Sequence, residues 1–261
     1  MKITDEIVCF DIETTGFSAW EDDFVCGAAS WMNVDEPKVW TSLEESITTV
    51  AGLGEFEGFI VTWNGENYRG GFDFPWLRSK CIQEGVEWKL AGVKHLDLLP
   101  LVRKYINTTH YVSEIPSRSS LRAADLKELA KVNGIDYQNK KQAYKALEEL
   151  GEQADWLDYI EPEPKEDNSL QAVYQMMFDP ECEEEYLDGG EVPKLYKWMK
   201  KISSVDEISM NDNAGAPQEF RNAWQKIKNH NRRDVERLKK IAEKVIPVIP
   251  DWEIERNINK L

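Results

Sequence analysis

The sequence predicts an α/β fold. β-branched and aromatic runs separated by polar turns fill residues 5–41, and later segments alternate between short apolar runs and helical periodicity. A strongly periodic stretch at 218–246 adds a long helix. With 261 residues, 41% hydrophobic and 11% aromatic, the chain can bury one sizeable core.

Three strands that suit a meander are expected first, over 5–12, 23–32 and 37–41. A helix over 43–50 and a short buried strand over 57–63 follow. The segment 74–84 predicts a helix, since Pro75 suits its first turn. KHLDLLPLVRKY, residues 94–105, predicts a strand that runs into a helix. An amphipathic helix is expected over 120–134, with Gly134 as its C-terminal stop.

Residues 136–215 have weaker periodicity and a high density of acidic residues. EPEPKEDNS, which begins at residue 161, is the most linker-like piece of this region. We interpret 136–215 as an acidic, mainly helical insertion or accessory region within a single domain that spans residues 1–261. The region is also a candidate contact surface for a partner protein.

The net charge of −16 argues against a protein that grips nucleic acid through a broad basic surface. No run of apolar residues is long enough to span a bilayer, and the N-terminus lacks the pattern of a signal peptide. We therefore expect no membrane association and a cytoplasmic location. The four cysteines lack CxxC spacing, which predicts free thiols.

FDIETTG, residues 10–16, places Asp11 and Glu13 at the end of a predicted strand. Side chains two apart in a strand share a face, so the two carboxylates predict a metal-binding pair. Further acids are Asp73 in FDFPWL and Asp234 in HNRRDV. Four carboxylates from three distant segments can hold two divalent cations, the usual apparatus for attack on a phosphodiester.

These segments resemble the three motifs of the DEDD 3′-to-5′ exonucleases, which have a ribonuclease H-like fold. FDIETTG looks like the first motif, and TWNGEN followed by FDFPWL is similar to the second motif of the proofreading domains of family B DNA polymerases. Tyr68-Arg69-Gly70-Gly71 looks like a small insertion between those halves. The resemblance covers roughly residues 5–135 and 218–246 and implies a mixed sheet flanked by helices.

The resemblance implies a 3′-to-5′ exonuclease that releases nucleoside 5′-monophosphates from single-stranded DNA or DNA 3′ ends. It implies two divalent cations, Mg²⁺ or Mn²⁺, held by Asp11, Glu13, Asp73 and Asp234, with Asp11 expected to bridge them. Two alternatives stay open. One is an exoribonuclease, and the other is a catalytically weak subunit that binds strand ends or a partner. The resemblance also implies that a partner at the acidic region 136–215 is a replication or repair protein.

His230 stands where the third motif normally has a Tyr, four residues before Asp234. Residues i and i+4 of a helix share a face, so both side chains are expected to point into the site. The imidazole then serves as general base or only orients the attacking water. Two other interpretations are a helix His bonded to a neighbour and a substitution that impairs catalysis.

Candidate nucleic-acid contacts lie beside each motif. Phe17, which follows Thr14 and Thr15, offers a ring for base stacking, with packing in the core as the alternative. Asn64 resembles a strand-contacting position of the family, and Arg232 and Arg233 are candidates for phosphate contact. A lysine stripe around Trp198 is either a guiding surface or a solvated helix face.

Overall fold

The chain divides into two compact units in the computed structural model, Met1–Thr108 with Asn168–Leu261 and, separately, Thr109–Asp167. The structure describes residues 7–52, 58–66, 70–112, 123–136, 139–150, 163–178, 190–202 and 217–261. Tyr68 and Arg69 therefore lie outside the described residues.

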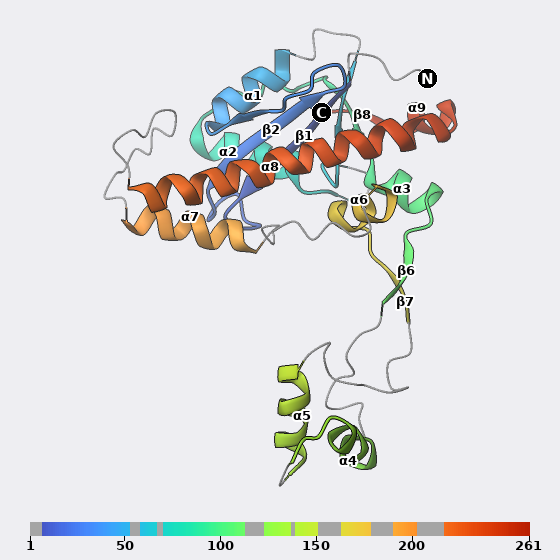
Figure 1. Ribbon diagram of the computed structural model, residues 1–261. Helices are drawn as coiled ribbons and strands as arrows, with labels where there is room; N and C mark the ends of the chain where they lie inside the picture. The colour runs from blue at the N-terminus through green and yellow to red at the C-terminus, as the bar shows by residue number, and fades with distance from the viewer. Residues whose placement is uncertain are drawn as a thin grey trace. The chain divides into compact units, whose positions relative to one another are not determined.

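A six-stranded mixed sheet forms the centre of the first unit, in the order β3-β2-β1-β4-β5-β8 (Figure 1). Its strands are β1 (Ile7–Thr14), β2 (Phe24–Trp31), β3 (Lys38–Trp40), β4 (Phe59–Thr62), β5 (Lys94–Asp97) and β8 (Ile258–Lys260). β1, β2 and β3 form the expected antiparallel meander, whereas β1, β4 and β5 run parallel. The prediction of an α/β fold is confirmed, and the sheet is compatible with a ribonuclease H-like fold.

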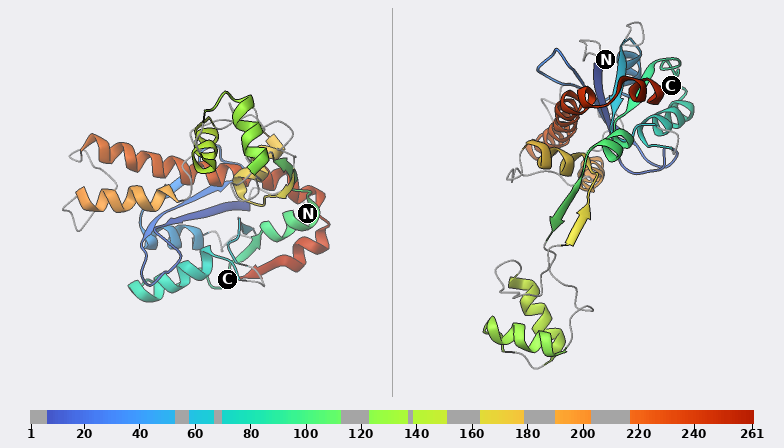
Figure 2. Two further views of the ribbon diagram at one scale, coloured as in Figure 1. Left: turned by 90° about the horizontal axis from the view of Figure 1, so that it is seen from below. Right: turned by 90° about the vertical axis from the view of Figure 1, so that its right-hand side faces the viewer.

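Helices cover both faces of this sheet. Figure 2, left, shows the sheet between α1 (Leu43–Gly52) and α2 (Asp73–Glu84) on one side and α8 (Gln218–Val245) with α7 (Glu191–Ile202) on the other. Side chains of β1 alternate between the two faces, as the strand period requires. Val8 and Phe10 pack with α1 and α2, whereas Ile7 and Cys9 pack with apolar residues of α8.

The C-terminal part of the chain adds a sheet edge that we did not expect from the sequence. After α8, a short 3-10 helix (Ile246–Val248) leads into α9 (Asp251–Asn257) and β8. β8 pairs antiparallel with β5, which is followed by α3 (Leu99–Tyr105). Helix α6 (Leu170–Phe178) packs on α8 through Val173. None of the helices that the structure describes has the length and apolar character needed to cross a membrane.

The second unit contains β6 (Thr109–Val112), α4 (Ala123–Val132), α5 (Lys140–Leu150) and β7 (Glu163–Glu166). β6 and β7 pair antiparallel, so the two ends of the unit lie together, as is common for an inserted domain. The segment that we expected to be a linker therefore holds the strand β7. Backbone pairing with β6 outweighs a composition that disfavours strands. The described residues of the acidic region 136–215 are divided between the two units, at Asp167 and Asn168.

Candidate metal centre

Asp11 and Glu13 lie near the carboxyl end of β1, on the face of the sheet that α8 covers. They continue the alternation of Ile7 and Cys9, whose side chains pack against α8. The strand ends at a register shift between Glu13 and Thr14. β1, β4 and β5 are parallel, so their carboxyl ends meet at one edge, where open α/β sheets commonly bind ligands.

Asp73 reaches this edge as the first residue of α2, because the loop after β4 folds back on itself. The Phe72 amide donates to the Asn64 carbonyl at 2.7 Å, and the Phe74 amide donates to the Gly65 carbonyl at 3.2 Å. Gly71 has φ of 130°, and a Cβ there would lie 2.6 Å from the Glu66 Cα. These contacts join the two halves of the second motif, and Asp73 is 4% exposed.

Helix α8 brings His230 and Asp234 to the same place. His230 Nε2 lies 3.3 Å from Glu13 Oε1 and 3.7 Å from Asp234 Oδ2, and the imidazole is almost fully buried. The ligand atoms of Glu13, His230 and Asp234 all lie within 4.8 Å of one another. The expected i,i+4 arrangement is present, and the main contact of His230 is with β1 rather than only with its own helix.

The acidic side chains of this edge act on one another's pKa values. Burial, and then the charge of Asp234, raises the pKa of Asp11 well above its ordinary value, although a hydrogen bond from Asn231 opposes the shift. Burial and the charges of Asp11, Asp234 and Asp73 raise the pKa of Glu13. Burial, and then the charges of Asp11 and Asp97, also raise the pKa of Asp73.

Three residues that we did not single out from the sequence hold this cluster in place. The Asn231 Nδ2 donates to Asp11 Oδ2 at 2.8 Å, and Cys26 Sγ donates to Asn231 Oδ1 at 3.6 Å. Arg237 Nη1 lies 3.7 Å from Asp234 Oδ1. Asp97, at the end of β5, accepts from the Asn64 and Leu99 amides at 2.9 and 3.1 Å. Helical spacing puts Arg237 on the face of Asp234, but no sequence signal marks Asn231 or Asp97.

No protein-family model and no curated protein matches this chain.

A divalent cation suits this donor set. Carboxylate oxygens are the ligands that Mg²⁺ and Mn²⁺ prefer. Asp73 Oδ2 is buried and has no hydrogen-bond partner among the described residues. Buried carboxylates that repel one another need a compensating positive charge. The side chains present thus fit a metal ion at Glu13, His230 and Asp234, with the carboxylates of Asp11 and Asp73 nearby.

The loop after β1 holds the first group of candidate nucleic-acid contacts. Thr14 Oγ1 donates to the Gly16 carbonyl at 2.8 Å. Thr15 is buried and accepts from the Asp23 amide at 2.8 Å, so its hydroxyl holds the loop together. Phe17 is 92% exposed and contacts the Phe72 ring edge-on at a centroid distance of 5.7 Å. The alternative that Phe17 packs in the core is thus wrong.

The other candidate contacts lie in the loop after β4, on α8 and on α7. Asn64 is exposed and has φ of 69°, and its backbone amide binds Asp97. Arg233 is half-buried on a flank of α8. Arg232 is exposed and lies two residues from His230, which places it on nearly the opposite side of the helix. In the lysine stripe, Lys200 Nζ pairs with Asp23 Oδ2 at 2.7 Å.

The raised pKa values predict that the metal-free cluster destabilises the fold at neutral and higher pH. Between the unfolded pKa of Asp73, 3.8, and its raised folded pKa, the folded chain binds more protons, so the free energy of unfolding falls as pH rises. Asp73→Asn should therefore raise the free energy of unfolding at pH 8 in EDTA by about 1 kcal/mol or more. Thermal unfolding from pH 4 to 8 measures the gain, which should shrink toward pH 4.

Asp251→Asn is the matched control, because Asp251 is also the first residue of a helix but is exposed and outside the cluster. We expect it to change stability by less than about 0.5 kcal/mol. Equal effects of the two substitutions, or destabilisation by Asp73→Asn in EDTA, would show that Asp73 is not part of a repulsive cluster.

Proposed function

We propose that this protein is a metal-dependent 3′-to-5′ exonuclease that releases nucleoside 5′-monophosphates from single-stranded DNA or DNA 3′ ends. The observation that carries the proposal is the group of Glu13, His230 and Asp234, whose ligand atoms lie within 4.8 Å of one another, with Asp11 and Asp73 close enough for their charges to raise the pKa of Glu13. Two divalent cations held there would supply a nucleophilic water at neutral pH and neutralise charge on the departing 3′ oxygen.

The residues around the cluster have separate roles in this proposal. Asn231 and Arg237 orient Asp11 and Asp234, respectively, so that the carboxylates are arranged before a cation binds. His230 contacts both Glu13 and Asp234, which is a suitable position for orienting the attacking water. The net charge of −16 is compatible with this role, since the substrate meets the cations rather than a bare acidic surface.

Phe17 and Phe72 supply an aromatic platform beside Asp73. Phe72 directly precedes Asp73, and its ring contacts the exposed ring of Phe17. Single-stranded nucleic acids bind such platforms by stacking of their bases. We therefore assign the terminal base of the substrate strand to these two rings.

Phe17→Ala should weaken binding of a short single strand to the protein by about 1–3 kcal/mol, the usual contribution of one stacked base. Its effect on thermal stability should be small because the ring is exposed. Fluorescence anisotropy with a labelled strand in Ca²⁺ measures the affinity. Ile82→Ala removes another exposed apolar side chain, ten residues after Phe72, and is the control. Equal affinity of wild type and Phe17→Ala would contradict the stacking role.

The proposed activity is tested with single strands of matched DNA and RNA sequence that carry a label at the 3′ or the 5′ end. With Mg²⁺ or Mn²⁺, a 3′ label should appear at once as mononucleotide, while a 5′ label should give a ladder of progressively shorter strands. Faster shortening of RNA than of DNA would favour an exoribonuclease. Lack of metal-dependent cleavage at protein concentrations where the strand binds would leave only a role in binding strand ends.

A further inference from the structure

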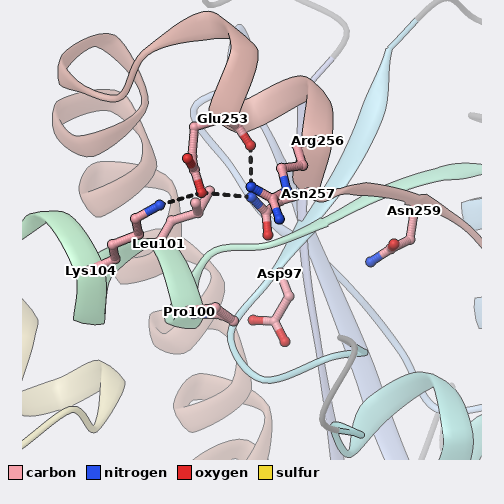
Figure 3. A pocket seen from close by; sticks show the side chains of 8 residues that line it. All are labelled: Asp97, Pro100, Leu101, Lys104, Glu253, Arg256, Asn257 and Asn259. Carbon is pink, nitrogen blue, oxygen red and sulfur yellow. Dashed lines mark hydrogen bonds and ion pairs between the residues drawn. The ribbon is translucent and has the colours of Figure 1, made fainter.

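A second site is suggested by a pocket of about 500 Å³ that lies where α3, α9, β5 and β8 meet (Figure 3). Pockets for small molecules commonly have volumes of about 300–1,000 Å³. The lining combines two cations, two carboxylates, two amides and a small apolar wall, namely Lys104, Arg256, Asp97, Glu253, Asn257, Asn259, Pro100 and Leu101. The volume and the mixed lining suit a small polar ligand.

Asp97 connects this pocket to the candidate metal centre. Its side chain lines the pocket, and its charge is close enough to contribute to the raised pKa of Asp73. Hydrogen bonds from the Asn64 and Leu99 amides fix Asp97 Oδ1. The pocket and the cluster therefore have Asp97 as a common neighbour.

Glu253 orients the Asn257 side chain at the pocket. Glu253 is 4% exposed, and its Oε1 accepts from Lys104 Nζ at 2.7 Å and from Asn257 Nδ2 at 3.4 Å. The Glu253 backbone carbonyl also accepts from Asn257 Nδ2, at 2.7 Å. These contacts occupy the amide nitrogen of Asn257 and leave its Oδ1 as an acceptor for a ligand that brings an N–H or O–H group.

Arg256 provides the complementary charge. Its exposed side chain lines the pocket and makes no ion pair or hydrogen bond that involves another described residue. Figure 3 shows Arg256 beside Asn257 on α9, with the Glu253 side chain between Arg256 and Lys104 of α3. A guanidinium fork matches the oxygens of a phosphate, and the Lys104 ammonium has further N–H donors beyond the one it gives to Glu253. A ligand that carries both a phosphate and hydrogen-bond donors satisfies the two kinds of group.

We propose that this pocket binds a nucleoside 5′-monophosphate. The phosphate lies on Arg256 and Lys104, and an amino group of the base or a hydroxyl of the sugar donates to Asn257 Oδ1. The choice of ligand rests on the proposed function, because nucleoside 5′-monophosphates are the product class of that reaction. The pocket would then hold a released nucleotide beside the site that produces it.

The test is isothermal titration of full-length protein with AMP and dAMP in EDTA, in an Asp11→Asn background. Under these conditions neither a cation nor catalysis contributes to the binding. Arg256→Ala should weaken nucleotide binding at least about 10-fold, because it removes a charge-assisted contact from an exposed position. Adenosine and inorganic phosphate should each bind at least about 10-fold more weakly than AMP.

Lys260→Ala is the matched control, since Lys260 is an exposed cation on β8 outside the lining, and it should change the affinity less than about 2-fold. The Asn257 side-chain amide resonance should shift on titration with AMP, which locates the ligand. Absence of detectable binding at 10 mM AMP would overturn the proposal, because the binding free energy would then be smaller than about 3 kcal/mol. Equal affinity for AMP and inorganic phosphate, or an unchanged affinity of Arg256→Ala, would also overturn it. The labelled-strand assay is independent of all these results.

Discussion

Asp11→Asn should reduce the rate of mononucleotide release by about 10³-fold or more. Asp11 is central to the cluster, since its charge acts on both Glu13 and Asp73 and its Oδ2 is fixed by Asn231. The amide keeps the shape of the side chain and an oxygen that can accept from Asn231, but it removes the charge that would attract cations. Loss of one such electrostatic contribution commonly lowers kcat by about 10²–10³-fold, and we expect the loss at this position to be at the upper end, at about 10³-fold.

The rate is measured as release of a 3′ label at saturating Mg²⁺ and at saturating Mn²⁺. Asp23→Asn is a suitable control, because Asp23 lies in the loop after β1 but pairs with Lys200 instead of joining the cluster. The control should retain activity within about 3-fold, which corresponds to the contribution of an exposed ion pair. An active Asp11→Asn protein would remove the basis for the proposed function.

His230→Phe should lower kcat by about 10²-fold or more while leaving the affinity for a single strand nearly unchanged. The imidazole is buried between Glu13 and Asp234, where it contacts the groups that would surround the attacking water. Phenylalanine fills a similar space without a hydrogen-bonding atom. His230→Tyr restores a polar atom at this position, and we expect its kcat to stay within about 10-fold of wild type.

Single-turnover rates and strand affinities of the two variants separate the catalytic role from a packing role. A merely structural His230 would give equal losses in both variants, together with lower thermal stability. Full activity of His230→Phe would instead show that the residue takes no part in the reaction.

Local sequence pattern was sufficient to predict the elements that carry the site. The alternation in FDIETTG places Asp11 and Glu13 on one face of β1, and the periodicity of α8 places His230 and Asp234 on the face toward that strand. Both predictions depend on spacing within one element, where the strand and helix periods decide which side chains share a face.

Features that depend on tertiary pairing could not be predicted. Asn231 is a single polar residue whose role arises from a contact with Asp11, 220 residues earlier. β7 has a composition that disfavours strands and forms one because β6 lies beside it. Phe17 carries no periodicity, so the sequence left its exposure open. α9 and β8, which build the second pocket, are too short to give a clear pattern.

The most direct test of the central claim is a titration of the protein with Mn²⁺ followed by electron paramagnetic resonance. The claim is that Asp11, Glu13, Asp73 and Asp234 together hold two divalent cations. Wild-type protein should bind two Mn²⁺ ions that are magnetically coupled because they share a ligand, and Asp11→Asn should lose the coupled signal. Binding only to isolated sites, with the same spectrum and stoichiometry in wild type and Asp11→Asn, would contradict the account.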